Sequence, residues 1–516
     1  MKINLSVPPL STDPVEFVQI NPGTLASDLA SLPRDDFLYS GHRILNDLEQ
    51  FNRASVDDEL RLKLLDLYRI NILNLAKRLR KSIGESHLPV NKKLLTRQKI
   101  TVDLHRQLTI GYKRILLSQD LAGNIDHSDN IAIISSERAI FSLLEILTLS
   151  YLSYTPVPKN TWKEMHIIFQ MAHKKGFTGI KVTDAADSNK SLKILDIYLF
   201  ALLLGLSEPY GLPNGGLYNL LCYFHLWISY LSLFDKNNLD GLRYFYRIDP
   251  DIDKAALPFP ESRPKGLLYV TTDSLVHQML GPNPPIDVPL DDKESKITSL
   301  SIHTYFPKLI SSWTKYPIRR FQRNNATGEI ELISGFEKII KFLKQRSDKP
   351  TGKQKNQIQV WKIRNDSATG LGLEYHGHEV KSVSVGDLVL YRMTNLDNNS
   401  RWVTGIIRRF SHLGRSHLSV GIQRMPPDVH PGTLYKISKA EKSSQPILMY
   451  PENRLLNSEA TLISAPGTYQ AGAKFQLSLD NGRKFQIRAI KVIQLNPVIE
   501  QFTFEPLDHP NSSENL

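Results

Sequence analysis

The spacing of apolar residues changes once along this chain, and that change limits the folds open to it. From about Tyr39 to Tyr246, apolar residues recur every three or four positions, which is the period of an amphipathic helix. One such face carries Leu60, Leu64, Leu67, Leu75 and Leu79. From Glu329 onward the apolar runs are short and divided by turn residues, which is typical of β-strands. We therefore predict an α+β multidomain protein, with an N-terminal all-α helical array followed by antiparallel β-domains.

Shifts in composition divide the chain into six segments. Prolines crowd the first 38 residues and the stretch from 247 to 289, which favours extended or irregular chain there. The predicted segments are an extended N-terminal arm (1–38), a helical scaffold domain (39–246), a proline-rich connector with helices (247–316), a β-domain (317–425), a second small β-domain (426–507) and a disordered tail (508–516).

Local signals place several elements within these segments. Ser55-Val56-Asp57-Asp58 has the spacing of a capping box and predicts a helix start. Asp480-Asn481-Gly482 between two apolar runs predicts a β-hairpin. Further helices are predicted at Lys93 to Gln119, Ser136 to Tyr154, Asn160 to Lys175, Leu192 to Leu206, Leu217 to Phe234 and Thr272 to Leu280.

Charge and cysteine content narrow the possible ligands and the compartment. The net charge of +12 and the pI near 9.4 point to an anionic partner, such as nucleic acid, anionic lipid or a small phosphate-bearing ligand. With Cys222 as its single cysteine, the chain has neither a disulfide framework nor a cysteine-based zinc site. The N-terminus lacks the apolar core of a signal peptide, and the two most apolar runs are too short or too interrupted to span a membrane. We expect a cytoplasmic protein without a transmembrane segment.

Two short motifs suggest a binding site. Asn365-Asp366-Ser367-Ala368-Thr369-Gly370 follows a strand-like run and leads back into extended chain, so it predicts a turn that presents polar groups beside a sheet. We expect Gly370 to adopt a positive φ there. Upstream, Arg319, Arg320 and Arg323 form a basic cluster. Their planar guanidinium groups suit phosphates and the O6/N7 edge of guanine.

At these residues the chain resembles the PilZ family of bacterial cyclic di-GMP receptors. That family's signature is Arg-x-x-x-Arg before a β-barrel, then Asp/Asn-x-Ser-x-x-Gly on the barrel. Arg319 and Arg323 match the first motif, while Asn365, Ser367 and Gly370 match the second, over a resemblance that extends roughly from Pro317 to Met425. The motifs are 42 residues apart in the sequence, because a helix-like piece and a basic linker intervene.

The resemblance implies a PilZ-like barrel that binds cyclic di-GMP through Arg319, Arg320, Arg323, Asn365, Ser367 and Gly370. It also implies an output in motility, surface attachment or polysaccharide production. We expect the helical domain to act as a scaffold that binds a protein partner. The alternative is a basic scaffold that binds RNA or single-stranded DNA, which would need basic and aromatic residues interleaved along one groove.

The sequence shows no constellation typical of an enzyme. It lacks a phosphate-binding loop, a nucleophile elbow and a His-Glu-x-x-His motif, so we predict neither catalysis nor a cofactor other than the ligand. His376 and His378, flanked by Glu374 and Glu379, have a spacing that could hold a metal ion. We interpret this stretch as a solvated turn between strands, and we predict no metal site.

Overall fold

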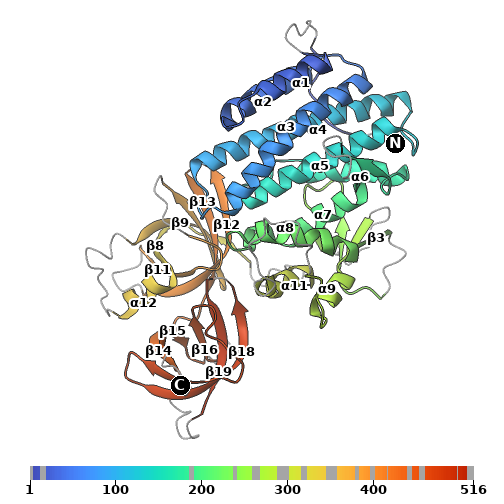
Figure 1. The fold of residues 1–516 in the computed structure, drawn as a ribbon. Helices are drawn as coiled ribbons and strands as arrows, with labels where there is room; N and C mark the ends of the chain where they lie inside the picture. The colour runs from blue at the N-terminus through green and yellow to red at the C-terminus, as the bar shows by residue number, and fades with distance from the viewer. Residues whose placement is uncertain are drawn as a thin grey trace.

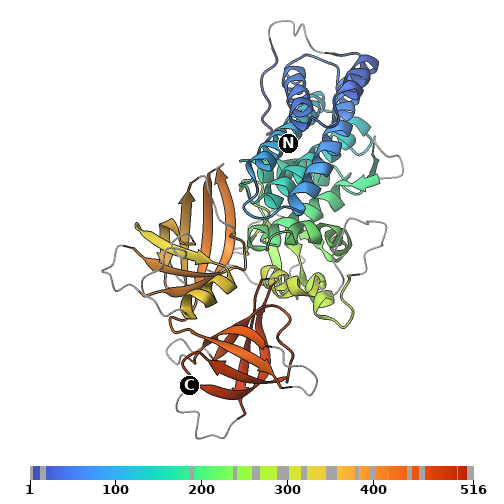
Figure 2. The same cartoon turned by 60° about the vertical axis from the view of Figure 1, so that its left-hand side comes forward.

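The computed structural model describes most of the chain. The described residues are 4–11, 19–184, 191–235, 241–258, 268–286, 302–314, 322–344, 357–377, 383–394, 401–414, 416–437, 444–452, 459–496 and 498–507. A helical domain contacts a middle β-barrel, and a C-terminal β-barrel lies at the end of the molecule farthest from the first two helices (Figures 1 and 2). The predicted order of a helical array followed by two β-domains is confirmed.

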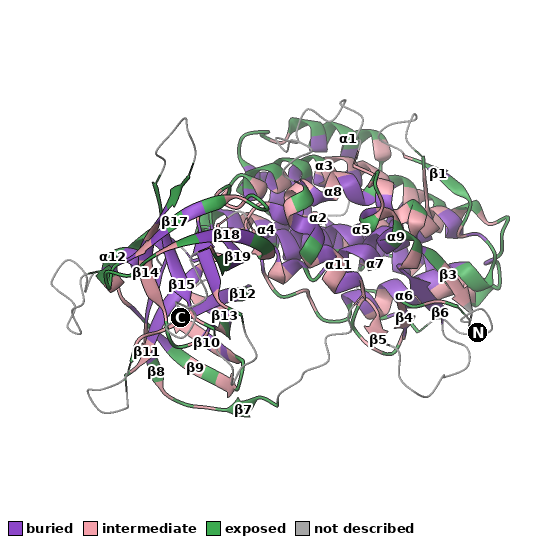
Figure 3. Ribbon diagram, turned by 90° about the horizontal axis from the view of Figure 1, so that it is seen from below, coloured by how far each residue is buried: buried purple, intermediate pink, exposed green. Residues whose placement is uncertain are grey.

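Long helices packed in antiparallel pairs build the helical domain. They are α1 (Pro22–Ser31), α2 (Phe37–Phe51), α3 (Asp58–Gly84), α4 (Lys92–Ala122), α5 (Asn130–Leu152), α6 (Thr161–Lys174), α7 (Ile194–Leu206) and α8 (Gly216–Trp227). Buried residues concentrate along α5 and α7 in the interior (Figure 3). These two helices are buried on most sides because neighbouring elements surround them. None of the described helices has the length and apolar character needed to cross a membrane.

Two helix starts differ from the sequence prediction. The predicted extended arm contains α1, because Asn21 caps the helix through bonds from the backbone N–H groups of Gly23 and Thr24. Pro22 occupies the first helical position, where its fixed φ and missing N–H suit a helix. The start of α3 is capped by Asp57, whose carboxylate accepts from Glu59 and Leu60, instead of by the predicted Ser55.

A small sheet replaces part of the predicted connector. The helix predicted to reach Phe234 ends at Trp227, and a four-stranded sheet follows in the order β3-β6-β4-β5. Its strands are too short for an alternating pattern to be visible in the sequence. They are β3 (Ser232–Asp235), β4 (Phe245–Ile248), β5 (Leu257–Pro258) and β6 (Leu268–Thr271). A separate pair of short antiparallel strands consists of β1 (Lys181–Thr183) and β2 (Ser191–Lys193). The short helices of this region are η1 (Pro209–Gly211), η2 (Ile228–Tyr230), α9 (Asp273–Leu280), η4 (His303–Tyr305) and α11 (Phe306–Thr314).

The middle barrel is one sheet that closes on itself. Its strands run in the order β10-β13-β12-β11-β8-β9-β7, and closure comes from a further pairing between β9 and β10. Its elements are β7 (Asn324–Asn325), β8 (Glu329–Ser334), α12 (Phe336–Lys344), β9 (Gln359–Ser367), β10 (Gly370–His376), β11 (Leu388–Met393), β12 (Val403–Gly414) and β13 (His417–Arg424).

The C-terminal domain is a second closed barrel, with strands in the order β14-β15-β16-β19-β18-β17. The predicted hairpin at 480–482 joins β17 to β18, and Gly482 adopts a φ of 91°, which suits glycine. Its strands are β14 (His430–Lys436), β15 (Ser444–Tyr450), β16 (Thr461–Ser464), β17 (Lys474–Leu479), β18 (Lys484–Leu495) and β19 (Glu500–Pro506).

The helical domain and the middle barrel share one continuous cluster of buried side chains. Tyr154 stacks edge-on against Phe410 of β12 at 5.6 Å, and its carbonyl accepts a 2.7 Å bond from the backbone N–H of His412. The His412 ring in turn accepts from the Val90 N–H at 3.1 Å. Burial lowers the pKa of His412 to about 4, so the ring is neutral near pH 7 and can serve as that acceptor.

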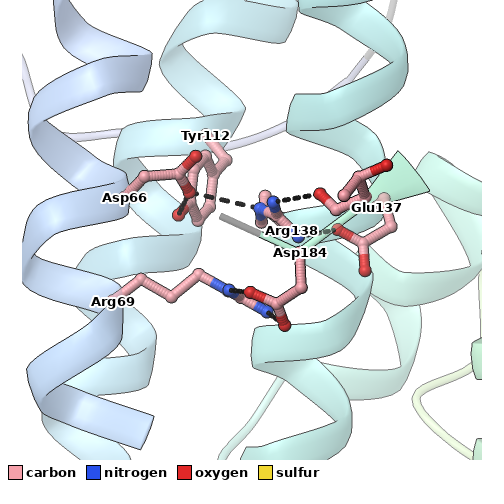
Figure 4. Close-up of polar contacts among 7 residues, drawn as sticks. Asp66, Arg69, Tyr112, Glu137, Arg138 and Asp184 are labelled. Atoms are coloured by element: carbon pink, nitrogen blue, oxygen red, sulfur yellow. Dashed lines mark hydrogen bonds and ion pairs between the residues drawn. The ribbon is translucent and has the colours of Figure 1, made fainter. Parts of the chain in front are cut away.

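A buried ionic network ties α3, α4 and α5 to the β1 region (Figure 4). Arg138 donates to Asp66 at 3.2 Å, to Glu137 at 2.7 Å and to the Thr183 carbonyl at 3.0 Å. Arg69 meets Asp184 through two bonds of 2.8 and 3.2 Å. Burial raises the pKa of Glu137 and of Asp66, although Arg138 opposes the shift in both. These carboxylates therefore depend on Arg138 to remain charged in the interior.

Replacing Arg138 should test this dependence. Arg138→Met leaves Asp66 and Glu137 without their cation, and removing one partner from a buried pair costs about 3–5 kcal/mol of unfolding free energy. Urea unfolding followed by far-UV circular dichroism measures the loss in the helical domain. The control is Arg43→Met, which removes an exposed pair with Asp47 at 3.2 Å and should change stability by less than about 1 kcal/mol. Equal unfolding midpoints for the two variants would contradict the dependence.

Candidate functional site

The predicted polar turn joins β9 to β10. Ser367 pairs with Gly370, and Asn365 pairs with Gly372, so the hairpin is tight and the motif residues lie opposite one another. The Ser367 hydroxyl donates to the Gly370 carbonyl at 3.1 Å. Ala368 and Thr369 at the turn are exposed. The motif is therefore part of a strand–turn–strand unit, as the sequence predicts.

The alternation of β10 separates an inner face from an outer one. Leu371 and Leu373 are buried inside the barrel, so Gly370 and Gly372 lie on the outer face. The register against β9 shifts between Gly372 and Leu373, which makes Arg364 the extra residue of a β-bulge. Because of this bulge, Asn365 pairs with Gly372 on the outer face.

Three outward glycines make a flat surface that we call the glycine platform, formed by Gly370, Gly372 and Gly421. Gly372 of β10 pairs directly with Gly421 of β13. A Cβ on Gly372 would lie 2.6 Å from the Asn365 side-chain oxygen, so that side chain already covers the position. Glycines inside strands mark close approach of a ligand or of another chain segment. The sequence analysis did not predict Gly372 and Gly421 as site residues. The alternating pattern Gly370-Leu371-Gly372 could have indicated Gly372, because it sets two glycines on one face of a strand.

Gly370 differs in one respect from the prediction. It lies in extended chain as the first residue of β10 and does not adopt a positive φ. Its small size matters because a Cβ there would meet the backbone carbonyl of Ile422 at 3.1 Å. The constraint is close packing against β13.

Strand pairing brings the end of the arginine motif to the turn. In β7, Asn324 pairs with Asp366 and Asn325 with Asn365. Continuing this antiparallel register sets Arg323, which is exposed, opposite Ser367. Although 41 residues separate Arg323 from Asn365 in the sequence, the pairing of β7 with β9 brings the ends of this stretch to the same sheet edge. Arg319 and Arg320 lie outside the described residues.

Further arginines missed by the sequence prediction surround the turn. Arg424 of β13 donates to Asp366 at 2.5 Å and to the Tyr391 hydroxyl at 3.2 Å, while its backbone N–H donates to the Thr369 carbonyl at 3.0 Å. These bonds hold the turn against β13 and neutralise Asp366. Arg408 of β12 donates to Gln423 at 2.7 Å and to Gln494 of the C-terminal barrel at 2.6 Å. No local pattern singles out these arginines, because only the strand register brings them to the turn.

A cavity of about 790 Å³ adjoins the platform where the three domains meet. Gln423, which pairs with Gly370 on the outer face, forms part of its wall. Cations from two domains also line it, namely Lys308, Arg408 and Arg424. Its volume lies in the range of small-ligand sites. The arrangement offers a flat floor, hydrogen-bonding side chains and positive charge, which is suited to an anionic ligand with planar groups.

Comparisons with known proteins agree with this domain order. Residues 24–236 match the family model described as the N-terminal domain of the cyclic-di-GMP receptor FimW. Residues 433–507 match the model described as the FimW C-terminal β-barrel domain. The middle barrel, with the candidate site, lies between the two matched stretches.

One curated protein is also similar to this chain in sequence. The protein named cyclic-di-GMP receptor FimW from Pseudomonas aeruginosa is 25% identical over 353 residues, which is 67% of this chain and 57% of the relative. The match thus spans little more than half of the relative's length. The two family models together cover more than half of this chain, one at each end and in the same order as in their descriptions. The chain is therefore similar to the FimW family in its helical domain and in its C-terminal barrel.

Proposed function

We propose that this chain is a receptor for cyclic di-GMP, which it binds on the outer face of the middle barrel. The observation that carries the proposal is the register of β7 against β9, since it pairs the two residues after Arg323 with Asp366 and Asn365 of the second PilZ-like motif. The names of the matched family model and of the relative support the same ligand. The alternative of a nucleic-acid-binding scaffold gains no support from the comparisons.

The chemistry of the site fits a cyclic dinucleotide. Arg323, together with Arg319 and Arg320, supplies guanidinium groups for phosphate oxygens and for the guanine edge. Asn365, whose side chain lies over Gly372, and Ser367 offer hydrogen-bonding groups beside Gly421, where a flat base can lie close to the backbone. Arg408 and Arg424 extend the positive charge into the adjoining cavity. These roles are binding roles, and a receptor needs no catalytic group.

Ligand binding would couple the arginine segment to the barrel. Helix α11 ends at Thr314 within the helical part, and the chain reaches β7 at Asn324. A ligand held by both motifs must fix the intervening arginines against the platform, and this ordering is favourable only when the charged contacts form. We propose that the helical domain then presents a surface to a protein partner, and that the protein acts in the cytoplasm on motility, attachment or polysaccharide production.

Titration calorimetry with cyclic di-GMP tests the ligand assignment. Arg323→Ala should lose charge-assisted bonds worth about 1.5–3 kcal/mol, which is roughly a tenfold or larger loss of affinity, and Arg319→Ala/Arg323→Ala should lose more. The matched control is Arg488→Ala on the C-terminal barrel, where the exposed Arg488 pairs with Glu505 at 3.2 Å. GTP and an RNA oligomer serve as competing ligands. If the double variant binds cyclic di-GMP with wild-type affinity, these arginines do not bind the ligand and the assignment is wrong.

The glycine platform can be blocked without strain. A Cβ on Gly421 would meet the Arg409 Cβ at 3.5 Å, which is ordinary van der Waals contact, so Gly421→Val should fold. Its side chain would stand on the platform and should weaken cyclic di-GMP binding by about tenfold or more, as expected when a few hydrogen bonds are lost. Gly414→Val, at the end of β12 with its nearest contact at 3.7 Å, is the control. If Gly421→Val melts and binds like the wild-type protein, the ligand does not use the platform.

Hydrogen exchange tests the coupling between the motifs. Adding cyclic di-GMP should raise protection in peptides covering 322–328 as well as in those covering 365–373, because one ligand contacts both. The hairpin of β17 and β18, which lies in the other barrel, should exchange at an unchanged rate. Protection confined to the β9–β10 turn would mean that the two motifs do not share a ligand.

A further inference from the structure

A second cluster of chemically active side chains lies on the outer face of the same hairpin. The sequence predicted a solvated turn at Glu374 to Glu379, but Glu374 and His376 are on strand β10, where His376 pairs with His417 of β13. The turn prediction was wrong for Glu374 and His376, because β10 continues to His376. For His378 and Glu379, which lie outside the described residues, it stays a prediction. One ligand atom from each of Glu374, His376 and His417 lies within 4.8 Å of the other two.

The distances suit a shared metal ion. The Glu374 Oε2 atom lies 3.1 Å from His417 Nε2 and 3.7 Å from His376 Nε2. Ligand atoms at about 2.0–2.1 Å from a tetrahedral zinc ion are separated by roughly 3.3 Å, so both spacings need only small adjustments. The two rings stack at 4.0 Å with an angle of 27°, which holds both imidazoles on the same side of the carboxylate.

Arg364 holds the carboxylate in the required orientation. Its Nε atom lies 3.3 Å from Glu374 Oε1, which leaves Oε2 directed at the two imidazoles. Charged partners of this kind beside a ligating carboxylate are a regular feature of metal sites. Arg364 is also the bulge residue of β9, so the irregularity that sets Asn365 on the platform also brings this arginine to Glu374.

We propose that Glu374, His376 and His417 form a binding site for a divalent transition-metal ion of the zinc class. Two imidazoles and one carboxylate are ligands that zinc prefers, and three protein ligands leave a position open for water. The site is partly exposed and has a guanidinium beside its carboxylate, so we expect micromolar affinity. The inference does not depend on cyclic di-GMP, because it uses no residue of the proposed ligand site.

A bound ion would join β10 to β13 near the hairpin that reaches the helical domain. His417 follows the turn from β12, and the same hairpin carries Ser411 and His412 to the carbonyl of Tyr154. Glu374 lies two residues from Gly372 on the same face of β10. The ion would therefore stiffen the sheet between the glycine platform and the joint with the helical domain.

Calorimetric titration with zinc sulfate tests the proposal. The full chain is prepared without a histidine tag, treated with EDTA and dialysed, and Cys222→Ser is used as the background because that thiol is a competing zinc ligand. We expect one saturable site per chain with a micromolar Kd. In this background, His417→Ala and Glu374→Gln should each weaken binding by about tenfold or more, the usual range for the loss of a ligand or its support.

The controls separate the cluster from incidental binding. His430→Ala alters a histidine of the C-terminal barrel and should leave zinc affinity unchanged. Thermal melting of each variant without zinc identifies any loss of folding, and a zinc-dependent rise in melting temperature should disappear in His417→Ala. The proposal is overturned if the Cys222→Ser protein binds no zinc at one equivalent, or if His417→Ala binds as tightly as its parent.

Discussion

Strand β9 is the element on which the middle barrel and its outer face depend. It pairs with β8 and with β10, which closes the barrel, and its last residues also pair with β7. The bulge at Arg364 changes the register within this one strand. It sets Asn365 opposite Gly372 and leaves Arg364 beside Glu374, so both sites on the outer face follow from a single inserted residue.

The glycine platform and the arginines belong together for electrostatic reasons. A phosphate-bearing ligand loses hydration when it meets a sheet, and cations and hydrogen-bond donors of the protein can replace the lost interactions. Arg424 is already bound to Asp366, and Arg408 to two glutamine side chains, so both are held in place without a ligand. Arg323 is exposed on the edge strand. The candidate site thus combines two arginines that are held in place by hydrogen bonds with a third that is exposed.

Sequence periodicity predicted the helices and strands whose buried positions repeat regularly. It did not predict elements and site residues whose placement depends on contacts between distant parts of the chain. The long helices and the C-terminal barrel were predicted because their apolar positions repeat. The helix α1 was missed because Pro22 suggested extended chain, although proline suits a first helical position when Asn21 caps the helix. At the site, Asn365 and Ser367 were found from their motif. Gly421 and Arg424 could not be found, because only the β10–β13 register brings them to that hairpin.

The packing between domains limits how a ligand signal can travel. Apolar clusters join the middle barrel both to the helical domain and to the C-terminal barrel. Opening either cluster would expose apolar surface to water, which costs a free energy of about 25 cal/mol for each Å² exposed. Breaking one hydrogen bond at the surface costs only about 1 kcal/mol, because water replaces the lost partner. The links most easily altered are therefore the polar ones at the cavity, such as Arg408, which bridges Gln423 of β13 to Gln494 of β18. A ligand that reached this arginine would change contacts between two barrels without separating their cores.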